Sequence, residues 1–498
     1  MAGIGFELKK LFRRKGIFAT MRAYGYAGIV CTGPMLLGVL LQVGILVLCS
    51  IMGVARANQD LLVCMVTYTL LASLTLTSFL SMPVTRYLAD MLYEEREEAI
   101  LPSFWGSCAI LLTSGTVLFG IFLLFSGATL LQGLLCLWLF NVMTVNWNAM
   151  SYLTAIKDYR GIRRAPFGPA SRRGAVGGRR TRLRRHAALG RGPASRVLPQ
   201  GGGSPWAFLR WVDRFLPLAL TGLFTDIGLF SHLVIIWAGP IGIQVKGLFY
   251  GAPYMDVPAL IAFLTVLVTS VNFVVSVEVN FYPRYRDYYS LFNDGGVVGD
   301  IIVAEDEMLA TLSRELRFTA LKQLFVTAAC ISLESTVLSA LPLGFNNLMH
   351  GYFRTLCVGY GLYAVGNTVL LILLYFTDYR GAVVSAGAFA GVSTVATALS
   401  LLAPQQYYGF GFLVGAAVFF LLALVRLDRF TRNLPYRILS CQPIVAREKA
   451  GWFTDLARGL ERAELQSERR RGEVPHGPFE RAFTSLFLRT KGGSHEHR

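Results

Sequence analysis

The stretch LPSFWGSCAILLTSGTVLFGIFLLFS, residues 101–126, decides the fold class because it contains no charged side chain. An apolar helix of about 20 residues spans the hydrocarbon core of a bilayer. Backbone groups inside lipid must be hydrogen-bonded within their own segment, so such a run forms a helix rather than an open strand. The same criterion predicts ten spans, at roughly 25–52, 61–82, 101–126, 128–155, 214–239, 254–282, 318–342, 350–377, 382–403 and 406–426. We therefore predict an all-α polytopic membrane protein with about ten readable transmembrane helices.

The composition supports this class. Only 15% of the 498 residues are charged, whereas a soluble domain carries about a quarter. The mean hydropathy is +0.51. The net charge of +17 is concentrated between the apolar runs, which indicates topology determinants and contacts with anionic lipid headgroups rather than a nucleic-acid surface. The first apolar run begins after two dozen residues and lacks a small-residue cleavage site, so we do not expect a signal peptide.

When the ten predicted helices are placed across the membrane one after another, most basic side chains fall in the loops on one side. The N-terminal segment is rich in lysine and arginine, and alternate loops contain Arg86, Arg96, Arg284, Arg286, Arg314, Arg317, Arg380, Arg426, Arg429, Arg432 and Arg437. The opposite loops offer little beyond Arg56, Lys246 and Arg354. Because positively charged loops stay in the cytoplasm, both termini are predicted to be cytoplasmic.

The segments between and around the spans have distinct compositions. We expect an amphipathic cytoplasmic lead-in at 1–24, a first bundle of four helices at 25–160, the first helices of a second bundle at 206–282, a cytoplasmic loop and helix at 283–317, the rest of the second bundle at 318–426, and a cytoplasmic tail at 427–498. Apolar residues at helical spacing predict that the helix within 283–317 leads directly into the next span. The charged tail is expected to be loosely helical or disordered.

Residues 161–205 break the pattern. In this segment 32 of 45 residues are Arg, Gly, Ala or Pro, and none is acidic. It could be a basic loop that meets anionic lipid, or a linker between two bundles. A third interpretation is a frameshift, because out-of-frame translation of a GC-rich gene produces this composition. About 45 residues would also accommodate two spans and a short turn.

Several longer motifs carry a family resemblance. They are MAGIGFELKKLF at 1–12, AYGYAGIVCTGP at 23–34, SFLSMPVTRYLADMLYEE at 78–95, FYPRYRDYYSLF at 281–292 and RNLPYRILSCQPIV at 432–445. The chain resembles the PelG family of Pel exopolysaccharide inner-membrane transporters over about 1–160 and 207–445. That family is similar to the polysaccharide-flippase and multidrug-extrusion superfamily.

The resemblance implies a fold and a function. It implies two six-helix bundles around a central cavity, so that residues 161–205 stand where the fifth and sixth helices are expected. It also implies export of a Pel-type amino-sugar polymer across the bacterial inner membrane during synthesis of the biofilm matrix. The implied partners are the polysaccharide chain, a cytoplasmic glycosyltransferase and a cyclic-di-GMP receptor.

Two polar stripes are candidates for the substrate path. They recur at helical spacing and comprise Asn141, Thr144, Asn148 and Tyr152 with the adjacent Trp147, and Thr265, Thr269, Asn272, Ser276 and Asn280. Such stripes must face protein or water in a membrane. Amides can hydrogen-bond sugar hydroxyls and rings can stack on sugar faces. Hydrogen bonding between packed helices is the alternative explanation.

A few spans contain residues that are costly or unusual in lipid. Asp226 and Glu334 lie near the centres of their predicted spans, and Glu278 lies nearer a cytoplasmic end. An intramembrane carboxylate is a candidate for proton or cation coupling, or else a structural ion pair. Pro34 lies within the first predicted span, and because proline kinks a helix it is a candidate hinge.

No enzyme constellation is present. The sequence contains no Walker loop, HExxH, GxSxG or DxD motif, and its eight cysteines form no CxxC pair. We therefore expect no catalytic activity, no cofactor, no metal site and no nucleic-acid partner. Two alternatives to a polysaccharide exporter stay open: an ion-coupled antiporter of the same fold for small molecules or lipid-linked substrates, and a scaffold for the polymerase.

Overall fold

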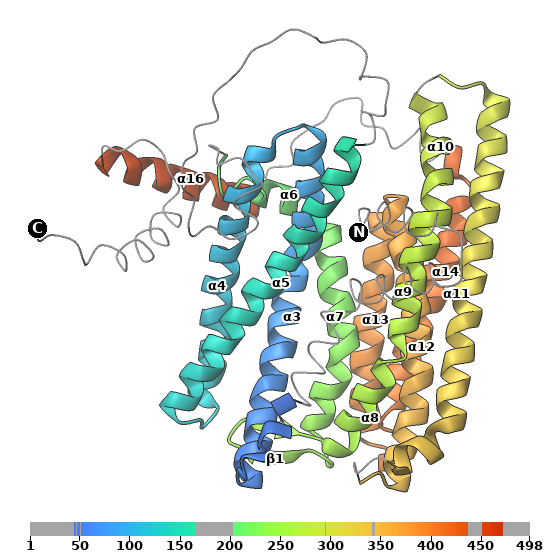
Figure 1. Ribbon diagram of the computed structural model, residues 1–498. Coiled ribbons are helices and arrows are strands. Elements are labelled where there is room, and N and C mark those ends of the chain that lie inside the picture. The colour runs from blue at the N-terminus through green and yellow to red at the C-terminus, as the bar shows by residue number, and fades with distance from the viewer. Residues whose placement is uncertain are drawn as a thin grey trace, which may run out of the picture.

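A computed structural model describes residues 44–45, 47–49, 51–164, 203–293, 295–340, 344–436 and 451–471. The predicted lead-in at 1–24, most of the first span with Pro34, and residues 165–202 lie outside this part of the chain. Within it, nine helices are long and apolar enough to cross a membrane, and they run side by side (Figure 1). These nine coincide with the remaining nine predicted spans, so the all-α polytopic class is confirmed.

The first group of helices comes from the N-terminal third of the chain. Helix α3 spans Arg56–Tyr93, a short 3-10 turn follows at Glu97–Ala99, and helices α4 and α5 span Ile100–Phe125 and Leu130–Arg164. Large apolar side chains are exposed on α4 and α5, among them Leu118, Leu124 and Trp138. A soluble protein would bury such residues, whereas here they can face lipid.

The second group begins with two helices and a hairpin. Helix α6 spans Leu209–Arg214 and α7 spans Leu216–Trp237. Strands β1, Ile243–Lys246, and β2, Phe249–Gly251, then pair antiparallel with Gln244 opposite Tyr250. The sequence analysis did not predict this hairpin. It lies at the lower end of the bundle in Figure 1, which we call the hairpin end.

The predicted span 254–282 is interrupted rather than continuous. It consists of α8, Pro253–Phe263, and α9, Val266–Val275, followed by a π-helical turn at Ser276–Phe281 and by α10, Tyr282–Asn293. The break after α8 coincides with Thr265, whose hydroxyl donates to the carbonyl oxygen of Ala262 at 2.8 Å. Local side-chain hydrogen bonds of this kind compete with the regular helical ladder.

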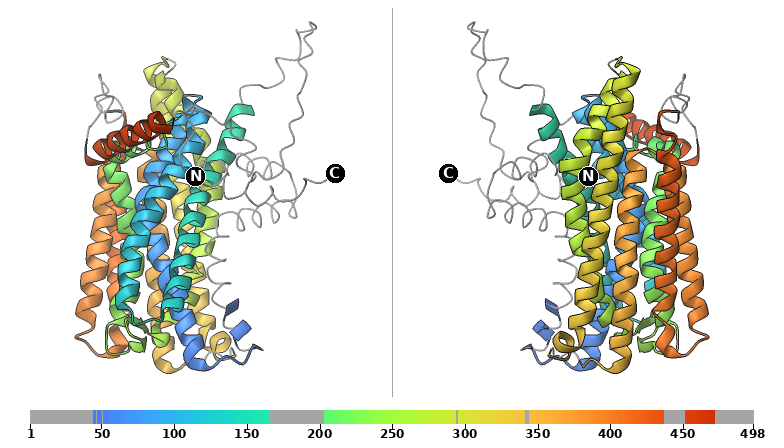
Figure 2. Two further views of the ribbon diagram at one scale, coloured as in Figure 1. Left: turned by 90° about the vertical axis from the view of Figure 1, so that its left-hand side faces the viewer. Right: turned by 90° about the vertical axis from the view of Figure 1, so that its right-hand side faces the viewer.

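The remaining helices complete the second group. They are α11, Val298–Ala340, α12, Asn347–Tyr375, α13, Tyr379–Ser400, and α14, Phe410–Thr431, with a 3-10 turn at Gln405–Tyr407 and a tail helix α16, Trp452–Arg471. At 43 residues, α11 is about 64 Å long, twice the hydrocarbon thickness of about 30 Å. The predicted helix within 283–317 and the span after it are therefore one element, and α10 and α11 rise together beyond the other helices (Figure 2).

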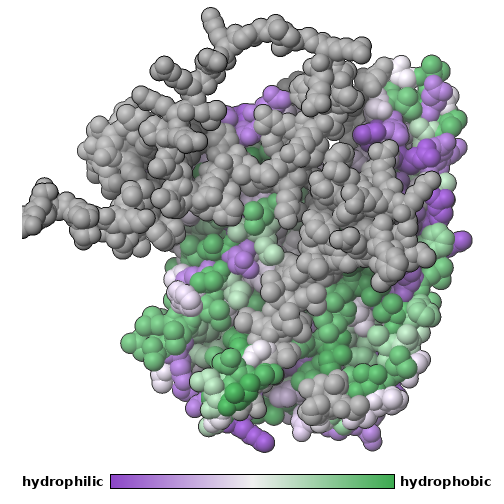
Figure 3. Space-filling view, viewed as in Figure 1, coloured by the Kyte–Doolittle hydropathy of each residue, from purple (hydrophilic) through white to green (hydrophobic). Residues whose placement is uncertain are grey.

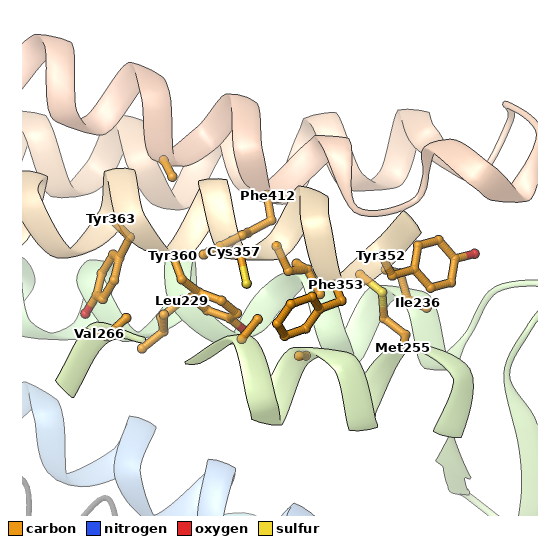
Figure 4. Packing of buried hydrophobic residues seen from close by; sticks show 14 of the residues in the cluster. Leu229, Ile236, Met255, Val266, Tyr352, Phe353, Cys357, Tyr360, Tyr363 and Phe412 are labelled. Atoms are coloured by element: carbon orange, nitrogen blue, oxygen red, sulfur yellow. The ribbon is translucent and has the colours of Figure 1, made fainter. Parts of the chain in front are cut away.

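The largest buried cluster lies between α7, α8, α12, α13 and α14. Figure 4 shows Phe353 and Tyr360 of α12 packed with Leu229 and Ile236 of α7 and Met255 of α8. A close crossing of α13 and α14 supports this cluster, because a Cβ added at Gly411 would lie 2.4 Å from the Thr397 backbone. Glycine therefore permits a helix contact that any larger residue would push apart.

The surface separates into an apolar band and polar ends. In Figure 3 hydrophobic residues cover much of the middle and lower face, and hydrophilic residues gather at the upper right, over the projecting parts of α10 and α11. On α11 itself, Leu321, Leu324 and Phe325 are exposed. This distribution is the one expected of a helix whose lower part contacts lipid and whose upper part contacts water.

The tail helix α16 is docked rather than free. It crosses the upper end of the first group (Figure 1, and Figure 2, left), which we call the tail-helix end. Asp213, near the end of α6, accepts hydrogen bonds from the Thr454 backbone N–H and hydroxyl, both at 2.6 Å, and from the Phe453 N–H at 3.4 Å. Glu461 accepts from Ser204 and Arg210, both at 2.7 Å. The charged tail thus contains an ordered helix held by residues 240 positions earlier in the chain.

Candidate functional site: two polar seams in the membrane region

The first polar stripe lies at the centre of the first helix group. Thr144, Asn148 and Tyr152 of α5 are buried. The Asn148 amide donates to Ser107 Oγ at 2.8 Å, and the Tyr152 hydroxyl donates to Ser103 Oγ at 3.2 Å. The stripe therefore faces α4, and hydrogen bonds of this kind join packed helices.

The rest of this stripe also contacts neighbouring helices. The Trp147 indole N–H donates to Ser73 Oγ of α3 at 3.1 Å. Asn141 accepts from the Thr116 hydroxyl of α4 at 3.1 Å. Four of the five predicted residues thus form hydrogen bonds with α3 or α4, as the alternative explanation of hydrogen bonding between packed helices requires, whereas the buried Thr144 hydroxyl donates to the Phe140 carbonyl oxygen within α5 at 2.8 Å. Their role in a substrate path stays a prediction.

The second polar stripe faces α11. Thr265, Thr269, Asn272 and Ser276 are buried. Thr269 Oγ1 donates to Gln323 Oε1 at 2.5 Å, and Asn272 Nδ2 donates to Thr319 Oγ1 at 2.7 Å. We call this contact between α9, the π-helical turn and α11 the α9–α11 seam.

One end of the seam is open. Lys322 of α11 is exposed, yet its Nζ donates to Asn272 Oδ1 at 2.6 Å. Asn280, which is exposed at the end of the π-helical turn, donates to Glu315 Oε1 at 2.9 Å. The side chain of Glu278, in the same turn, lies outside the described residues.

Sequence reasoning missed the α11 half of the seam. Glu315, Thr319, Gln323 and Thr327 follow one another at intervals of four, and residues four apart lie on one face of a helix. Gln323 and Thr327 are also hydrogen-bonded to each other at 3.2 Å. The signal was the same polar periodicity that identified the two other stripes.

Asp226 lies where α7 crosses α3. One turn earlier in α7, Gly222 allows close approach, since an added Cβ would lie 2.5 Å from the Ser78 carbonyl oxygen. The Ser78 side chain interacts with the Asp226 carboxylate, and the Ser78 hydroxyl donates to the Thr75 carbonyl oxygen at 2.8 Å. Among the residues that the structure describes, it has no ion-pair partner within 4.0 Å. Asp226 is therefore an intramembrane carboxylate with no cation beside it in the described part of the chain.

Glu334 has a different environment. Its side chain is 1% exposed and forms an ion pair with Arg354 of α12. His350 Nδ1 is 3.6 Å from Glu334 Oε1, and Glu334 Oε2 has no hydrogen-bond partner. The role of Glu334 in ion coupling stays a prediction. Because α11 ends at Ala340, Glu334 is only about 9 Å from the end of the helix.

The tail-helix end contains a further ion pair, which the sequence did not predict. Asp378 caps α13 by accepting from the Gly381 N–H at 3.2 Å, and it also accepts from Arg426 Nη2 of α14 at 2.9 Å. The carboxylate thus joins the start of α13 to the end of α14. Nothing in the spacing of Asp378 and Arg426 indicated that they meet.

Comparison with known proteins gives two matches. The sequence matches the PelG family, exopolysaccharide exporter (EPS-E), over residues 1–167 and 195–439, and the interruption falls inside the Arg/Gly-rich segment 161–205. A solved structure described as the outward-facing conformation of a multidrug resistance MATE family transporter of the MOP superfamily is similar at 14% identity and a TM-score of 0.42. That match covers 89% of this chain and 100% of the other. No curated protein matches.

Proposed function

The chain belongs to the PelG family of exopolysaccharide exporters, and on that premise we propose that it moves a Pel-type amino-sugar polymer across the bacterial inner membrane during synthesis of the biofilm matrix. The observation that carries this proposal is the family match over most of a multi-pass helical membrane protein. The energy of polymerisation can push the growing chain, so the transporter itself needs no nucleotide site.

We propose that the tail-helix end is cytoplasmic. Arg86, Arg284 and Arg426 lie toward this end of their helices, and Arg96 lies in the connection between α3 and α4. Lys246, by contrast, lies in the hairpin at the other end. Positively charged loops are retained on the cytoplasmic side of a membrane. The docked helix α16 and the projecting ends of α10 and α11 then face the compartment in which the polymer is made.

We propose that the α9–α11 seam borders the polymer path. Its hydrogen bonds run between two helices, so separating α9 from α11 would leave amide and hydroxyl groups without partners. Sugar hydroxyls and water can replace those partners. The π-helical turn at Ser276–Phe281 supports the assignment, since such turns occur frequently at functional sites. The stripe on α5 is enclosed by α3 and α4, and we assign it the role of holding the first group together.

We propose that the projecting ends of α10 and α11 bind the cytoplasmic synthesis proteins, which the family resemblance identifies as a glycosyltransferase and a cyclic-di-GMP receptor. Val297, Val298 and Ile302 at this tip are exposed. Acidic residues accompany them, so an anionic membrane surface would repel the tip. A protein surface with an apolar patch and basic residues would fit.

The proposal is tested by transport into proteoliposomes. The purified protein is reconstituted with the cytoplasmic glycosyltransferase outside, and radiolabelled amino-sugar polymer is measured in the lumen after external polymer has been digested. We expect lumenal polymer that requires both proteins. The Asn272→Leu variant, in the seam, should reduce it about tenfold. The Thr116→Val variant, which removes one hydrogen bond to Asn141 in the first group, is the matched control and should export normally. Polymer synthesis without lumenal product would contradict export.

An ion-coupled antiporter is the second candidate, and Asp226 is the observation that favours it. A carboxylate without an ion-pair partner can bind and release a proton or cation. In the same liposomes, efflux of a small cationic dye driven by a proton gradient, and lost in Asp226→Asn, would support this function. Polymer export unchanged by Asp226→Asn would oppose it.

We further propose that a frameshift placed residues 161–205 where the fifth and sixth helices of the family belong. The interruption of the family match at 168–194 supports this interpretation. Sequencing the gene across codons 158–206 tests it, and an uninterrupted frame that encodes this same peptide would exclude it.

A further inference from the structure

The β1–β2 hairpin belongs to the second helix group but makes its closest contacts with the first. At its tip, Gly247 has a φ of +55°, and a Cβ there would lie 1.9 Å from the Ser126 carbonyl oxygen. The next residue, Leu248, donates its N–H to that oxygen at 3.1 Å. Gly127, also with a positive φ of +69°, lies against Gly247. Two glycine turns from opposite groups therefore touch backbone to backbone, which only residues without a side chain allow.

The strands behind the tip extend this contact onto α3. Phe249 is 0% exposed in a cluster with residues of α3, α4 and α5, and its ring lies 5.3 Å from that of Tyr68. The Tyr250 N–H donates to the Tyr68 hydroxyl at 3.3 Å. The Cys64 thiol donates to the Tyr250 carbonyl oxygen at 3.4 Å. At the rim, Lys246 Nζ donates to Gln132 Oε1 of α5 at 2.9 Å.

The base of the hairpin is fixed to its own group. The Asp256 carboxylate of α8 accepts from the Ala252 N–H and from the Trp237 indole N–H of α7, each at 2.9 Å. This carboxylate ties the end of α7, the end of β2 and the start of α8 together. The hairpin therefore moves with the second group, and any separation of the groups at this end must break its contacts with α3, α4 and α5.

The contact of the hairpin with the first helix group can break more easily than the joint that fixes the hairpin to the second group. The contact with the first group includes the buried Phe249 ring, the partly buried Val245, one glycine-to-glycine approach and a few hydrogen bonds. The polar partners Lys246 and Gln132 lie at the rim, where water can replace each lost bond. The joint at Asp256, by contrast, has a carboxylate bonded on both oxygens.

We propose that the hairpin is a latch that closes the two helix groups against each other at the hairpin end and that must release for the polymer to leave. This inference rests on the proposed export function. The latched arrangement places the hairpin over the end of the α3–α7 crossing, across to the α4–α5 turn. Release frees that end of the second group without unfolding either helix group.

The first test locks the latch with a reversible cross-link. Lys246→Cys and Gln132→Cys are combined and bridged with a short bifunctional methanethiosulfonate reagent, then reconstituted for export as above. We expect the bridged protein to lose at least tenfold in export and to regain it when the bridge is reduced. The two single variants and the unsubstituted chain, given the same reagent, are the controls. Full export by the bridged protein beside active controls would overturn the latch.

The second test does not depend on export. Cys64 lies under the hairpin and is 7% exposed, so its reaction with a membrane-impermeant maleimide, followed by mass spectrometry of its peptide, reports release. We expect slow labelling in the unsubstituted chain, at least tenfold faster labelling in Phe249→Ala, and at least tenfold slower labelling in the bridged double variant. Labelling that the bridge leaves unchanged would overturn the latch. If the control proteins exported no polymer but the bridge still slowed the labelling of Cys64, the result would refute the export function and support the latch.

Discussion

Replacing Asp213 with alanine should release the tail helix α16 while leaving the membrane helices folded. Asp213 accepts hydrogen bonds from three donors in the first turn of α16, the Phe453 and Thr454 N–H groups and the Thr454 hydroxyl. The first N–H groups of a helix have no partner within it. A carboxylate at this position also interacts favourably with the helix dipole.

The magnitude follows from these bonds. Removing an N-terminal cap costs about 0.5–2 kcal/mol, and hydrogen bonds to a charged group contribute about 1.5–3 kcal/mol each. Water can reach the half-buried Asp213 and replaces part of this energy, so we take a loss of about 2 kcal/mol. That loss raises the undocked population of α16 about 30-fold.

Limited trypsin digestion in lipid nanodiscs measures this population, because cleavage of a briefly opened segment follows its open fraction when closing is fast. The product cut after Arg462 in α16 should form about 30-fold faster in Asp213→Ala. Asp455→Ala is the matched control. Asp455 is an exposed acidic residue of the same turn whose ion pair with Arg458 lies within α16, so its loss should change the rate by about twofold at most. Equal cleavage of Asp213→Ala and the unsubstituted chain would refute the docking argument.

Three further substitutions test the packing and polar contacts by thermal unfolding of the purified protein. Gly411→Ala, whose methyl would lie 2.4 Å from the α13 backbone, should destabilise by about 1–3 kcal/mol, whereas Gly391→Ala, with open space around it, should not; equal melting temperatures would contradict the close crossing. Arg354→Ala leaves the buried Glu334 without its cation, so it should lower the melting temperature more than the double variant Arg354→Ala/Glu334→Gln does; a double variant no more stable than Arg354→Ala would refute the pairing. Asn272→Leu strands the donors and acceptors of α11 and should cost about 1–3 kcal/mol, and an unchanged melting temperature would show that the seam is already hydrated.

Hydropathy predicted the helical spans because lipid imposes one rule on every segment that crosses it. Residues 101–126, without a charge, correspond to α4 at Ile100–Phe125. The helix within 283–317 was predicted to lead directly into the next span, and α11, Val298–Ala340, is indeed continuous. The polar ladder on α11 was equally open to prediction, since Thr319 and Gln323 follow the same spacing as the stripes that were found.

The features that sequence reasoning missed depend on partners far apart in the chain. Asp213 meets Thr454 and Asp378 meets Arg426, and no local periodicity connects either pair. The β1–β2 hairpin is short and its strands have mixed exposure, so hydropathy could not separate it from a loop. Gly247 was a local sign of a turn, because glycine readily adopts the positive φ that it has here. Its close contact with Ser126 in the other helix group could not be predicted from that sign.

The π-helical turn at Ser276–Phe281 has a consequence for insertions and deletions in this protein. A π turn accommodates one more residue than the α-helical turn it replaces. Deleting a single residue there would let the segment become regular α-helix, with no gap in its backbone hydrogen bonding. Because the wide turn holds the extra residue within one revolution, the deletion would leave α9 and α10 in nearly the same relative orientation. A one-residue deletion confined to this turn would thus keep the same residues of α9 facing α11, whereas a deletion within the regular part of α9 would rotate the residues on either side of it by about 100° relative to each other.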